Sequence, residues 1–267
     1  MMELMPKTML VDSLMTRIYP NRNELGRDAG LQIANKIREL QQSQETVNII
    51  FAAAPSQNET LDQLAQETSI DWSRINAFHM DEYVGLDDDS PQRFGNYLRE
   101  RLFKRLPFRY VYYINGNAND IQQECTRYED LLKRNPTDIV CMGIGENTHI
   151  AFNDPHVSDF HDPQLVKIVD LDHACRQQQV NDGCFENIGA VPTHAITLTV
   201  PALFQSRYVF CMVPGENKAA AVYLTLTKKV NDKIPSTILR RHSNAILFLD
   251  QDSAGVVKAS AEGSSFP

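Results

Sequence analysis

The sequence predicts an α/β fold built on a mostly parallel sheet. Short apolar runs alternate with segments whose apolar residues recur at helical intervals, which is typical of parallel strands joined by helical crossovers. Several of the apolar runs stop abruptly in glycine, proline or polar residues, as buried strands do at their ends. With 267 residues, of which 42% are hydrophobic, the chain can bury a large core. We therefore expect residues 1–267 to form a single domain.

The first part of the chain contains two strands and two helices. In the segment 23–42 apolar residues recur every three or four positions, and Asn23 is a suitable cap, so a helix is predicted there. The β-branched and apolar segment 46–54 predicts a strand, which leads through a polar loop into a helix over 59–66. The short apolar segment 75–80 predicts the next strand.

The rest of the chain continues this alternation. Ser90 caps a predicted helix whose first residue is Pro91, and the helix continues over 92–106. A segment rich in Arg, Gln and Asn, 172–186, shows only polar character, and the tail 260–267 is expected to be frayed. The remaining predicted strands are 110–114, 138–142, 165–171, 195–200, 208–213 and 245–249, and the remaining predicted helices are 120–134, 216–226 and 235–241.

The acidic charge balance of the chain restricts its partners. The formal net charge is −8 at pH 7, and no Lys-rich or Arg-rich block offsets it, which argues against nucleic acid and against a membrane surface. The most basic stretch, 99–109, interleaves Arg with Leu and Phe at helical spacing, which indicates the solvated face of a helix. An anionic substrate would therefore need a local basic pocket.

The cysteine pattern and the amino-terminal segment predict a reduced, cytoplasmic location. The 5 Cys residues are scattered, odd in number and free of any Cys-x-x-Cys pair, so neither a disulfide framework nor a zinc site is predicted. The amino-terminal segment has no continuous apolar run after a basic region, and no run of about 18 apolar residues occurs anywhere in the chain. We therefore expect a protein that neither inserts into a membrane nor is secreted.

One loop concentrates polar chemistry. The predicted strand 138–142 passes through Gly143 and Gly145 into a loop that contains His149 and Asp154. Glycine lets a backbone turn sharply and approach a ligand closely. His149 can transfer a proton near neutral pH when a carboxylate holds one ring nitrogen, and Asp154 is the candidate for that carboxylate. A strand-to-loop crossing with a hydrogen-bonded core histidine is the alternative, because short glycine motifs occur by chance.

Two further polar groups follow predicted strands. Asp81 and Glu82 come directly after the strand 75–80, and ligands of open α/β sheets bind beyond the carboxyl ends of such strands. Because neighbouring side chains of an extended chain point to opposite faces, only one of these carboxylates can act in a site. The strand-loop-helix junction at 55–59 would direct backbone N–H groups at an anion, although a capped connection without a ligand explains it equally well.

Six motifs of the chain fall in the order seen in one enzyme family. They are FHMDEYVGL at 78–86, YINGNAND at 113–120, GIGENTHIAFNDP at 143–155, AITLTVPAL at 195–203, PGENKA at 214–219 and PSTILRRH at 235–242. With these motifs the chain resembles the glucosamine-6-phosphate deaminase/isomerase family over nearly its whole length. The resemblance implies a Rossmann-like α/β fold, an open and mostly parallel sheet with helices on both faces.

The resemblance also implies an activity, the isomerisation of an aldose amino sugar 6-phosphate to fructose 6-phosphate with loss of ammonia. Asp81 matches the general base that moves a proton between C2 and C1 of the sugar, which leaves Glu82 a structural role. His149 matches the histidine that opens the pyranose ring. Lys218 matches a phosphate-binding lysine, and Arg176 is the nearest candidate for an arginine that grips the phosphate.

This chemistry requires no cofactor, because one carboxylate at a rigid strand end can reach both carbons. A metal site made of Asp81, His149 and Asp154 is a weaker interpretation, because these residues lack the spacing typical of metal ligands. The predicted partner is a small phosphosugar. The family includes a hexamer, so a homo-oligomer is an open alternative, but no stripe of residues specifies an interface.

The chain departs from the family pattern around the histidine. Asp154 stands where the family has glutamate, and Asn147 stands where it usually has aspartate, so Asn147 cannot place a charge beside His149. Thr148 replaces a usual glycine, and a β-branched residue would be strained there if the position requires a positive φ. We expect Asn147 and Asp154 to belong to the catalytic group, and Gly145 to lie against the substrate.

The phosphate loop departs from the family as well. In the family the first strand runs into a Gly-Gly-Thr loop, whereas this chain reads AAPSQNET, without glycine. Ser56, Gln57 and Asn58 can donate hydrogen bonds from their side chains instead.

These departures leave several functions open. The substrate could be galactosamine 6-phosphate or another phosphosugar rather than glucosamine 6-phosphate. The related 6-phosphogluconolactonases share the fold and a glycine-histidine loop, although the intact MDEYVGL and AFNDP segments favour the deaminase. A third alternative is a regulator that binds a phosphosugar without turning it over.

Overall fold

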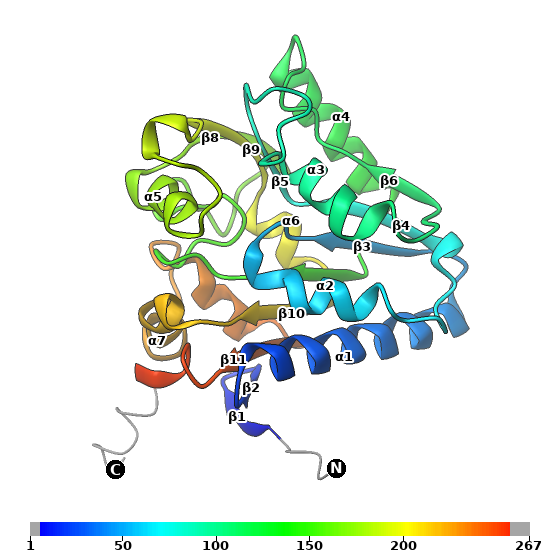
Figure 1. Cartoon of the computed structure of the whole chain (residues 1–267), viewed down its shortest axis with the longest axis vertical. Helices are drawn as coiled ribbons and strands as arrows, with labels where there is room; N and C mark the ends of the chain where they lie inside the picture. Colours follow the sequence, from blue (N-terminus) through cyan, green and yellow to red (C-terminus); the bar gives the residue numbers. More distant parts are fainter. Residues whose placement is uncertain (1–5, 257–267) are drawn as a thin grey trace.

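The computed structural model describes residues 6–256, and its main feature is an eight-stranded sheet with the order β1-β2-β11-β10-β7-β3-β4-β6 (Figure 1). β1 pairs antiparallel with β2, and all other neighbouring strands of this sheet run parallel. The predicted open, mostly parallel α/β fold is therefore confirmed. The strands are β1 (Lys7–Val11), β2 (Leu14–Tyr19), β3 (Val47–Phe51), β4 (Ile75–His79), β6 (Tyr110–Tyr112), β7 (Ile139–Met142), β10 (Tyr208–Val213) and β11 (Ala245–Asp250).

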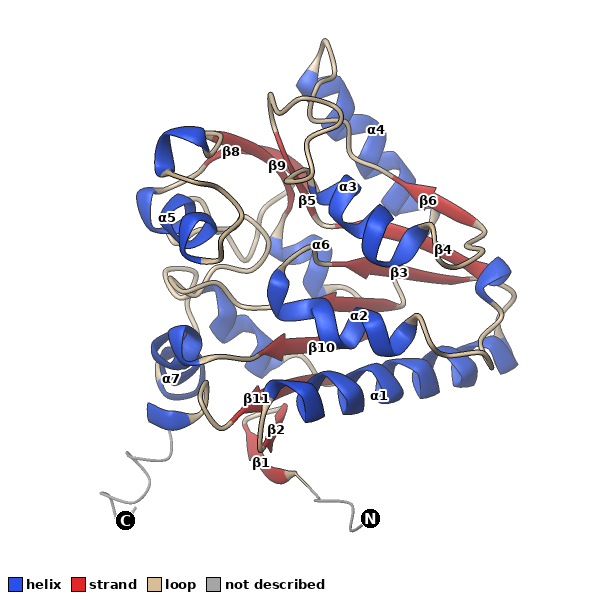
Figure 2. Ribbon diagram, in the orientation of Figure 1, coloured by secondary structure: helices blue, strands red, loops and turns tan. Residues whose placement is uncertain are grey.

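Helices cover both faces of this sheet, and each face has its own hydrophobic core (Figure 2). Successive residues of a strand point to opposite faces, so Ile49 and Phe51 of β3 lie in one core and Ile50 lies in the other. α1 contributes Ile33 to the first core, and α4 contributes Tyr128 to the second. The helices are α1 (Arg22–Ser43), α2 (Asn58–Leu64), α3 (Phe94–Leu98), α4 (Ile121–Arg134), α5 (His173–Asn181), α6 (Val200–Phe204) and α7 (Ala219–Thr227), with shorter turns η1 (Pro55–Gln57), η2 (Trp72–Arg74), η3 (Arg99–Phe103), η4 (Ile188–Ala190), η5 (Glu216–Lys218) and η6 (Pro235–Arg241).

A second, three-stranded antiparallel sheet adjoins the first, with the order β5-β9-β8. It consists of β5 (Asp81–Tyr83), β9 (His194–Leu198) and β8 (Val166–Asp170). The strands predicted over 165–171 and 195–200 are thus present, but they do not join the parallel sheet. Only Met80 separates β4 from β5, so the chain passes directly from one sheet to the other. This crossing places Asp81 at the carboxyl edge of the parallel sheet.

Two predicted helix starts are wrong for an identifiable reason. The cap of α1 is Asn21 rather than Asn23, because the side chain of Asn21 accepts a hydrogen bond from the backbone N–H of Glu24. The helix predicted from Ser90 onward begins later, at Phe94, and its second part, η3, is a π-helix. The first N–H groups of α3 donate to the carboxylate of Glu82, a residue from another element that no local pattern identifies.

Three other segments differ from expectation or lie beyond comparison. The polar segment 172–186 contains the helix α5, which Asp172 caps by accepting a hydrogen bond from the backbone N–H of Cys175. The entry segment contains the hairpin of β1 and β2, which the sequence did not predict. The tail 260–267 lies outside the described residues. Within residues 6–256, no helix is both long enough and apolar enough to cross a lipid bilayer.

Candidate active site

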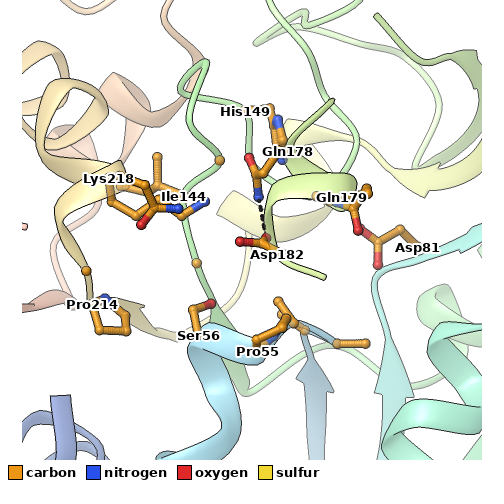
Figure 3. A pocket seen from close by; sticks show the side chains of 18 of the residues that line it. Pro55, Ser56, Asp81, Ile144, His149, Gln178, Gln179, Asp182, Pro214 and Lys218 are labelled. Carbon is orange, nitrogen blue, oxygen red and sulfur yellow. Dashed lines mark hydrogen bonds between the residues drawn. The ribbon is translucent and has the colours of Figure 1, made fainter. Parts of the chain in front are cut away.

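A cavity of about 140 Å³ lies where β3, β4, β7 and β10 end (Figure 3). In an open α/β sheet this edge is where ligands bind, because the loops after parallel strands meet there. Most of the residues that line the cavity come from these loops and from the α5 segment. They include Ser56, Asp81, Gly145, His149, Asp182 and Lys218.

Asp81 is a buried carboxylate without a close cation. Its side chain lines the cavity and the residue is only 7% exposed. Burial, with a smaller contribution from the charge of Glu82, raises the pKa of Asp81 well above its ordinary value. His79 holds the backbone at this point, since its Nδ1 lies 2.8 Å from the carbonyl oxygen of Asp81 and its Nε2 accepts from the N–H of Ile114. The result is a rigidly placed carboxylate with raised basicity.

Glu82 points away from the cavity and stabilises the fold by accepting backbone hydrogen bonds. Its carboxylate accepts hydrogen bonds from the backbone N–H groups of Tyr83, Phe94 and Gly95, at 2.9, 3.0 and 3.0 Å. Arg93 lies 3.9 Å away. The alternation of the extended chain therefore separates two adjacent carboxylates, one facing the cavity and one tying α3 to the small sheet.

His149 is held by two oxygen atoms on one side of its ring. Nδ1 lies 2.7 Å from Oδ1 of Asn147 and 3.1 Å from Oδ1 of Asp154. Burial acts to raise the pKa of Asp154, but the hydrogen bond and charge of His149 and the amide of Asn147 outweigh it, so this pKa lies below its ordinary value. The carboxylate thus stays ionised and fixes the proton on Nδ1, which leaves Nε2 as the proton acceptor.

The ring of His149 lies directly against Gly145. A Cβ atom at position 145 would lie 2.2 Å from Cε1 of His149, so only glycine leaves room for the ring. Thr148, the residue before His149, has a φ of 75°, a conformation that β-branched residues rarely adopt. The expected strain at the position where the family has glycine is therefore present, and the loop is held in a strained form.

Replacing Gly145 with alanine is expected to displace His149 and to lower kcat about 100-fold, because a displacement of about 1 Å can cost that much. Steady-state kinetics and the melting temperature of G145A measure the two consequences separately. The matched control is G255A, since a Cβ at position 255 would meet nothing within 4 Å. If G145A kept full activity, the tight contact with His149 would be irrelevant to the site.

The ammonium group of Lys218 is a buried cation in the wall of the cavity. The residue is 5% exposed, and burial lowers the pKa of its ammonium group because a buried charge loses hydration. Among residues 6–256 its Nζ donates no hydrogen bond, although Asp182 and Glu146 act on it electrostatically. Ser56 faces the same cavity from η1. A phosphate bound between Ser56 and Lys218 would give this buried ammonium group a hydrogen-bonded anion.

Three residues predicted to bind substrate do not line this cavity. Gln57 is buried and donates to the hydroxyl of Ser56 and to the carbonyl of Met212, at 3.0 and 3.2 Å. Asn58 accepts from the hydroxyl of Tyr97 and lines a neighbouring cavity. Arg176 donates to two backbone carbonyls near η4, at 2.6 and 2.9 Å. Gln57 can therefore orient Ser56, whereas Arg176 is used within the α5 segment.

Comparison with known proteins agrees with this arrangement. The sequence profile of the family described as "glucosamine-6-phosphate isomerases/6-phosphogluconolactonase" matches residues 20–248. The chain belongs to this family. A glucosamine-6-phosphate deaminase of Bacillus cereus strain B4264 is 37% identical over 188 residues, which cover 70% of each chain. One from Bacillus thuringiensis strain Al Hakam is 36% identical over the same share.

Solved structures of the family have the same fold. A monomeric glucosamine-6-phosphate deaminase superposes with a TM-score of 0.83 at 28% identity, covering 91% of this chain and 99% of that one. The 6-phosphogluconolactonase of Thermotoga maritima superposes with a TM-score of 0.72 at 22% identity, covering 88% and 99%, which supports the fold alone.

Several cavity residues of this family member were not predicted from the sequence. Gln178 lies in α5 and Asp182 is the cap residue at the carboxyl end of this helix, and Nε2 of Gln178 donates to Oδ2 of Asp182 at 3.3 Å (Figure 3). Arg22 reaches the cavity edge from the first turn of α1, where it binds Glu59 at 2.8 Å and the carbonyl of Pro55 at 2.9 Å. No local motif distinguishes these residues from ordinary helix-surface residues.

His149, which lines the cavity, belongs to a group of donor atoms that could hold a metal ion. Donor atoms of His149, Asp154 and Cys175 lie within 4.8 Å of one another, whereas Asp81 is not part of this group. Burial and the nearby carboxylates hold the pKa of Cys175 well above its ordinary value, so its thiol stays protonated. His149 Nδ1 is already bound to Asn147 and Asp154. This donor set fits a hydrogen-bonded relay better than a metal centre.

Proposed function

We propose that this protein is a glucosamine-6-phosphate deaminase that releases ammonia and forms a ketose 6-phosphate. The observation that carries the proposal is the presence of the Asp81 carboxylate, the His149 imidazole and the Lys218 ammonium group around one cavity. These three groups supply a base, a proton relay and an anion site. The likeness to named deaminases at 37% identity supports the same reaction.

The residues divide the reaction into steps. His149, with its Nε2 directed away from Asn147 and Asp154, relays the proton that moves between the C1 hydroxyl and the ring oxygen when the sugar ring opens. Asp81 then removes the C2 proton of the open aldehyde and returns it to C1, while the C1 oxygen gains the proton that the amino group loses as the C2 imine forms. The resulting C2 imine is hydrolysed by water, so nitrogen leaves as ammonia and C2 becomes the ketone carbon.

The environment of Asp81 suits this task. A base is most effective when its pKa approaches the working pH, and burial moves the pKa of Asp81 in that direction. Lys218 and Ser56 would hold the phosphate, so that remote binding energy positions C1 and C2 against the carboxylate. Gly145 allows His149 and the sugar to approach the loop after β7.

The alternatives are a different epimer, a lactone substrate and binding without turnover. Galactosamine 6-phosphate differs from glucosamine 6-phosphate at one hydroxyl group, and the cavity residues do not select between them. 6-Phosphogluconolactonases of solved structure that resemble this chain include those of Thermotoga maritima and Trypanosoma brucei, at 22% and 17% identity, which makes lactone hydrolysis the weaker candidate.

The decisive experiment measures ammonia and ketose phosphate from glucosamine 6-phosphate and galactosamine 6-phosphate, with 6-phosphogluconolactone hydrolysis assayed in parallel. We expect stoichiometric ammonia and fructose 6-phosphate from glucosamine 6-phosphate. Thermal stabilisation by the same sugars is recorded for each, because a ligand that binds only the native state raises the melting temperature. Stabilisation without product would establish a silent binding protein, and lactone hydrolysis alone would replace the proposed reaction.

A further inference from the structure

The side-chain amide of Asn147 lies between the imidazole of His149 and two carboxylates. Its Oδ1 accepts hydrogen bonds from Nδ1 and from the backbone N–H of His149, at 2.7 and 3.1 Å. Its Nδ2 donates to Oδ1 of Asp154 at 3.0 Å and to Oδ2 of Asp172 at 3.2 Å. An asparagine at this position therefore joins a histidine to two anions.

The orientation of this amide is fixed by its partners. If the amide were turned round, its NH₂ group would face two N–H groups of His149, and its oxygen would face two carboxylates. The observed orientation is thus the one that satisfies every group. The dipole of the amide is aligned from the carboxylates to His149, so the charge of Asp172 polarises the oxygen that contacts the ring.

Asp172 uses both of its carboxylate oxygens. Oδ1 accepts the backbone N–H of Cys175 at 2.6 Å and so caps α5, while Oδ2 faces Asn147. The backbone N–H of Asp172 also donates to Oδ2 of Asp154 at 3.3 Å. The first turn of α5 is thereby tied to the histidine, and the same helix carries Gln178 into the cavity.

We propose that Asp172 is a positioning residue of the reaction, which supplies through Asn147 the negative charge that stabilises the protonated form of His149. The proposal rests on the proposed function for the step in which His149 carries a proton. It also explains how a chain with Asn147 in place of an aspartate retains charge at the histidine. The charge resides 25 positions further along the sequence and reaches the ring through an amide.

The other titratable groups around this network do not replace Asp172. Asp154 contacts His149 directly and is present in every variant considered below. Cys175 has a raised pKa and is neutral. His156 lies near Asp154 and Asp172 but binds Asp170 at 3.0 Å.

On the cavity side, Glu146 and Asp182 act on Lys218, whereas the carboxylates that contact the Asn147–His149 pair are those of Asp154 and Asp172. Removal of the Asp172 charge should therefore weaken the stabilisation of a protonated His149 ring, because an anion close to a cationic acid stabilises its protonated form.

The test compares D172N, D172S and the double variant N147D/D172N. Asparagine and serine both cap helices nearly as well as aspartate, so the single variants remove the charge and keep the cap. The double variant places a carboxylate beside His149 and restores the number of charges. The pKa of His149 is measured by NMR titration of its imidazole resonances, which H149Q identifies among the 7 histidines of the chain.

We expect both single variants to lower the pKa of His149 by about one unit, which corresponds to about a tenfold change in its protonation equilibrium. The double variant should restore this equilibrium to within about threefold of its wild-type value. D120N is the matched control, because Asp120 caps α4 in the same way by accepting from Gln123 and has no contact with His149.

Two results would overturn the proposal. One is a pKa of His149 in D172N and D172S within about 0.2 units of the wild-type value, a difference too small for a nearby charge. The other is a double variant whose His149 titration is no closer to that of the wild type than the titration of D172N. Because the titration needs no turnover, it tests the role of Asp172 even if the sugar substrate is assigned wrongly. An inactive wild-type protein that shows the expected titrations would reject only the proposed function.

Discussion

Asp81→Asn is expected to reduce kcat for ammonia release about 1000-fold, since asparagine cannot accept the C2 proton and general-base catalysis contributes 10² to 10⁴-fold. The shape of the cavity is retained, so KM should change little. The wild-type rate should decrease as the pH is lowered, because the buried carboxylate becomes protonated. Since the pKa of Asp81 is raised, this decrease should begin at a higher pH than for an ordinary aspartate. Steady-state kinetics over pH 4–9 measure both effects.

The same substitution is expected to stabilise the fold at neutral pH. The pKa of Asp81 is higher in the folded than in the unfolded state, so ionisation opposes folding at pH values above the unfolded-state pKa, and this cost grows until the pH reaches the folded-state pKa. D81N removes this cost and should raise the free energy of unfolding at neutral pH. Below about pH 3.9, where aspartate is protonated even when unfolded, the difference should disappear.

D89N is the matched control for this prediction, because Asp89 is an exposed carboxylate on the loop that follows β5. It should leave both turnover and stability unchanged. An active D81N would remove Asp81 from the mechanism. A D81N variant that is inactive but less stable than the wild type would show that the carboxylate holds the structure together.

Lys218→Met is expected to raise KM for the sugar phosphate about 100-fold, because truncation of one partner of a buried charge pair costs about 2–5 kcal/mol. Methionine keeps most of the apolar stem and removes the ammonium group. Without substrate, K218M should be more stable than the wild type at neutral pH, since burial opposes the protonated form of Lys218. The pKa of Lys218 is lowered by folding, so this gain is present below the folded-state pKa and disappears above the unfolded value of about 10.4.

K229M provides the control, because Lys229 is exposed beyond the end of α7. Inorganic phosphate gives a second measurement. It should raise the melting temperature of the wild type and of K229M, but not that of K218M. Equal phosphate stabilisation of all three proteins would place the anion site elsewhere.

The motif after β7 illustrates what a local sequence predicts well. A buried strand followed by Gly143 and Gly145 requires a turn at the edge of the sheet, and a histidine a few residues later must lie near that edge. The same reasoning places Asp81 and Glu82 directly after β4, and the family resemblance selects Asp81. Lys218 and Ser56 also follow strands of this sheet, and they line the same cavity as Asp81.

Arg176 shows where such reasoning ends. The family resemblance made it the nearest candidate for a phosphate-binding arginine, yet its guanidinium donates to the carbonyls of Ile188 and Val191. The cavity instead receives Gln178 of α5 and Asp182, the residue that caps the carboxyl end of this helix. Which face of a short polar helix is directed inward depends on packing with distant segments, since α5 has no apolar stripe to determine it.

The sequence by itself determined the order of strands and helices, the family and the side chains that follow each parallel strand. These features depend on the spacing of apolar residues and on motifs that lie within a few positions of one another. Only the tertiary structure decided that Glu82 caps α3, that β5, β8 and β9 form a separate sheet, and that Asp172 reaches Asn147. Hydrogen bonds between distant segments leave no local periodicity, because their geometry exists only after the chain has packed.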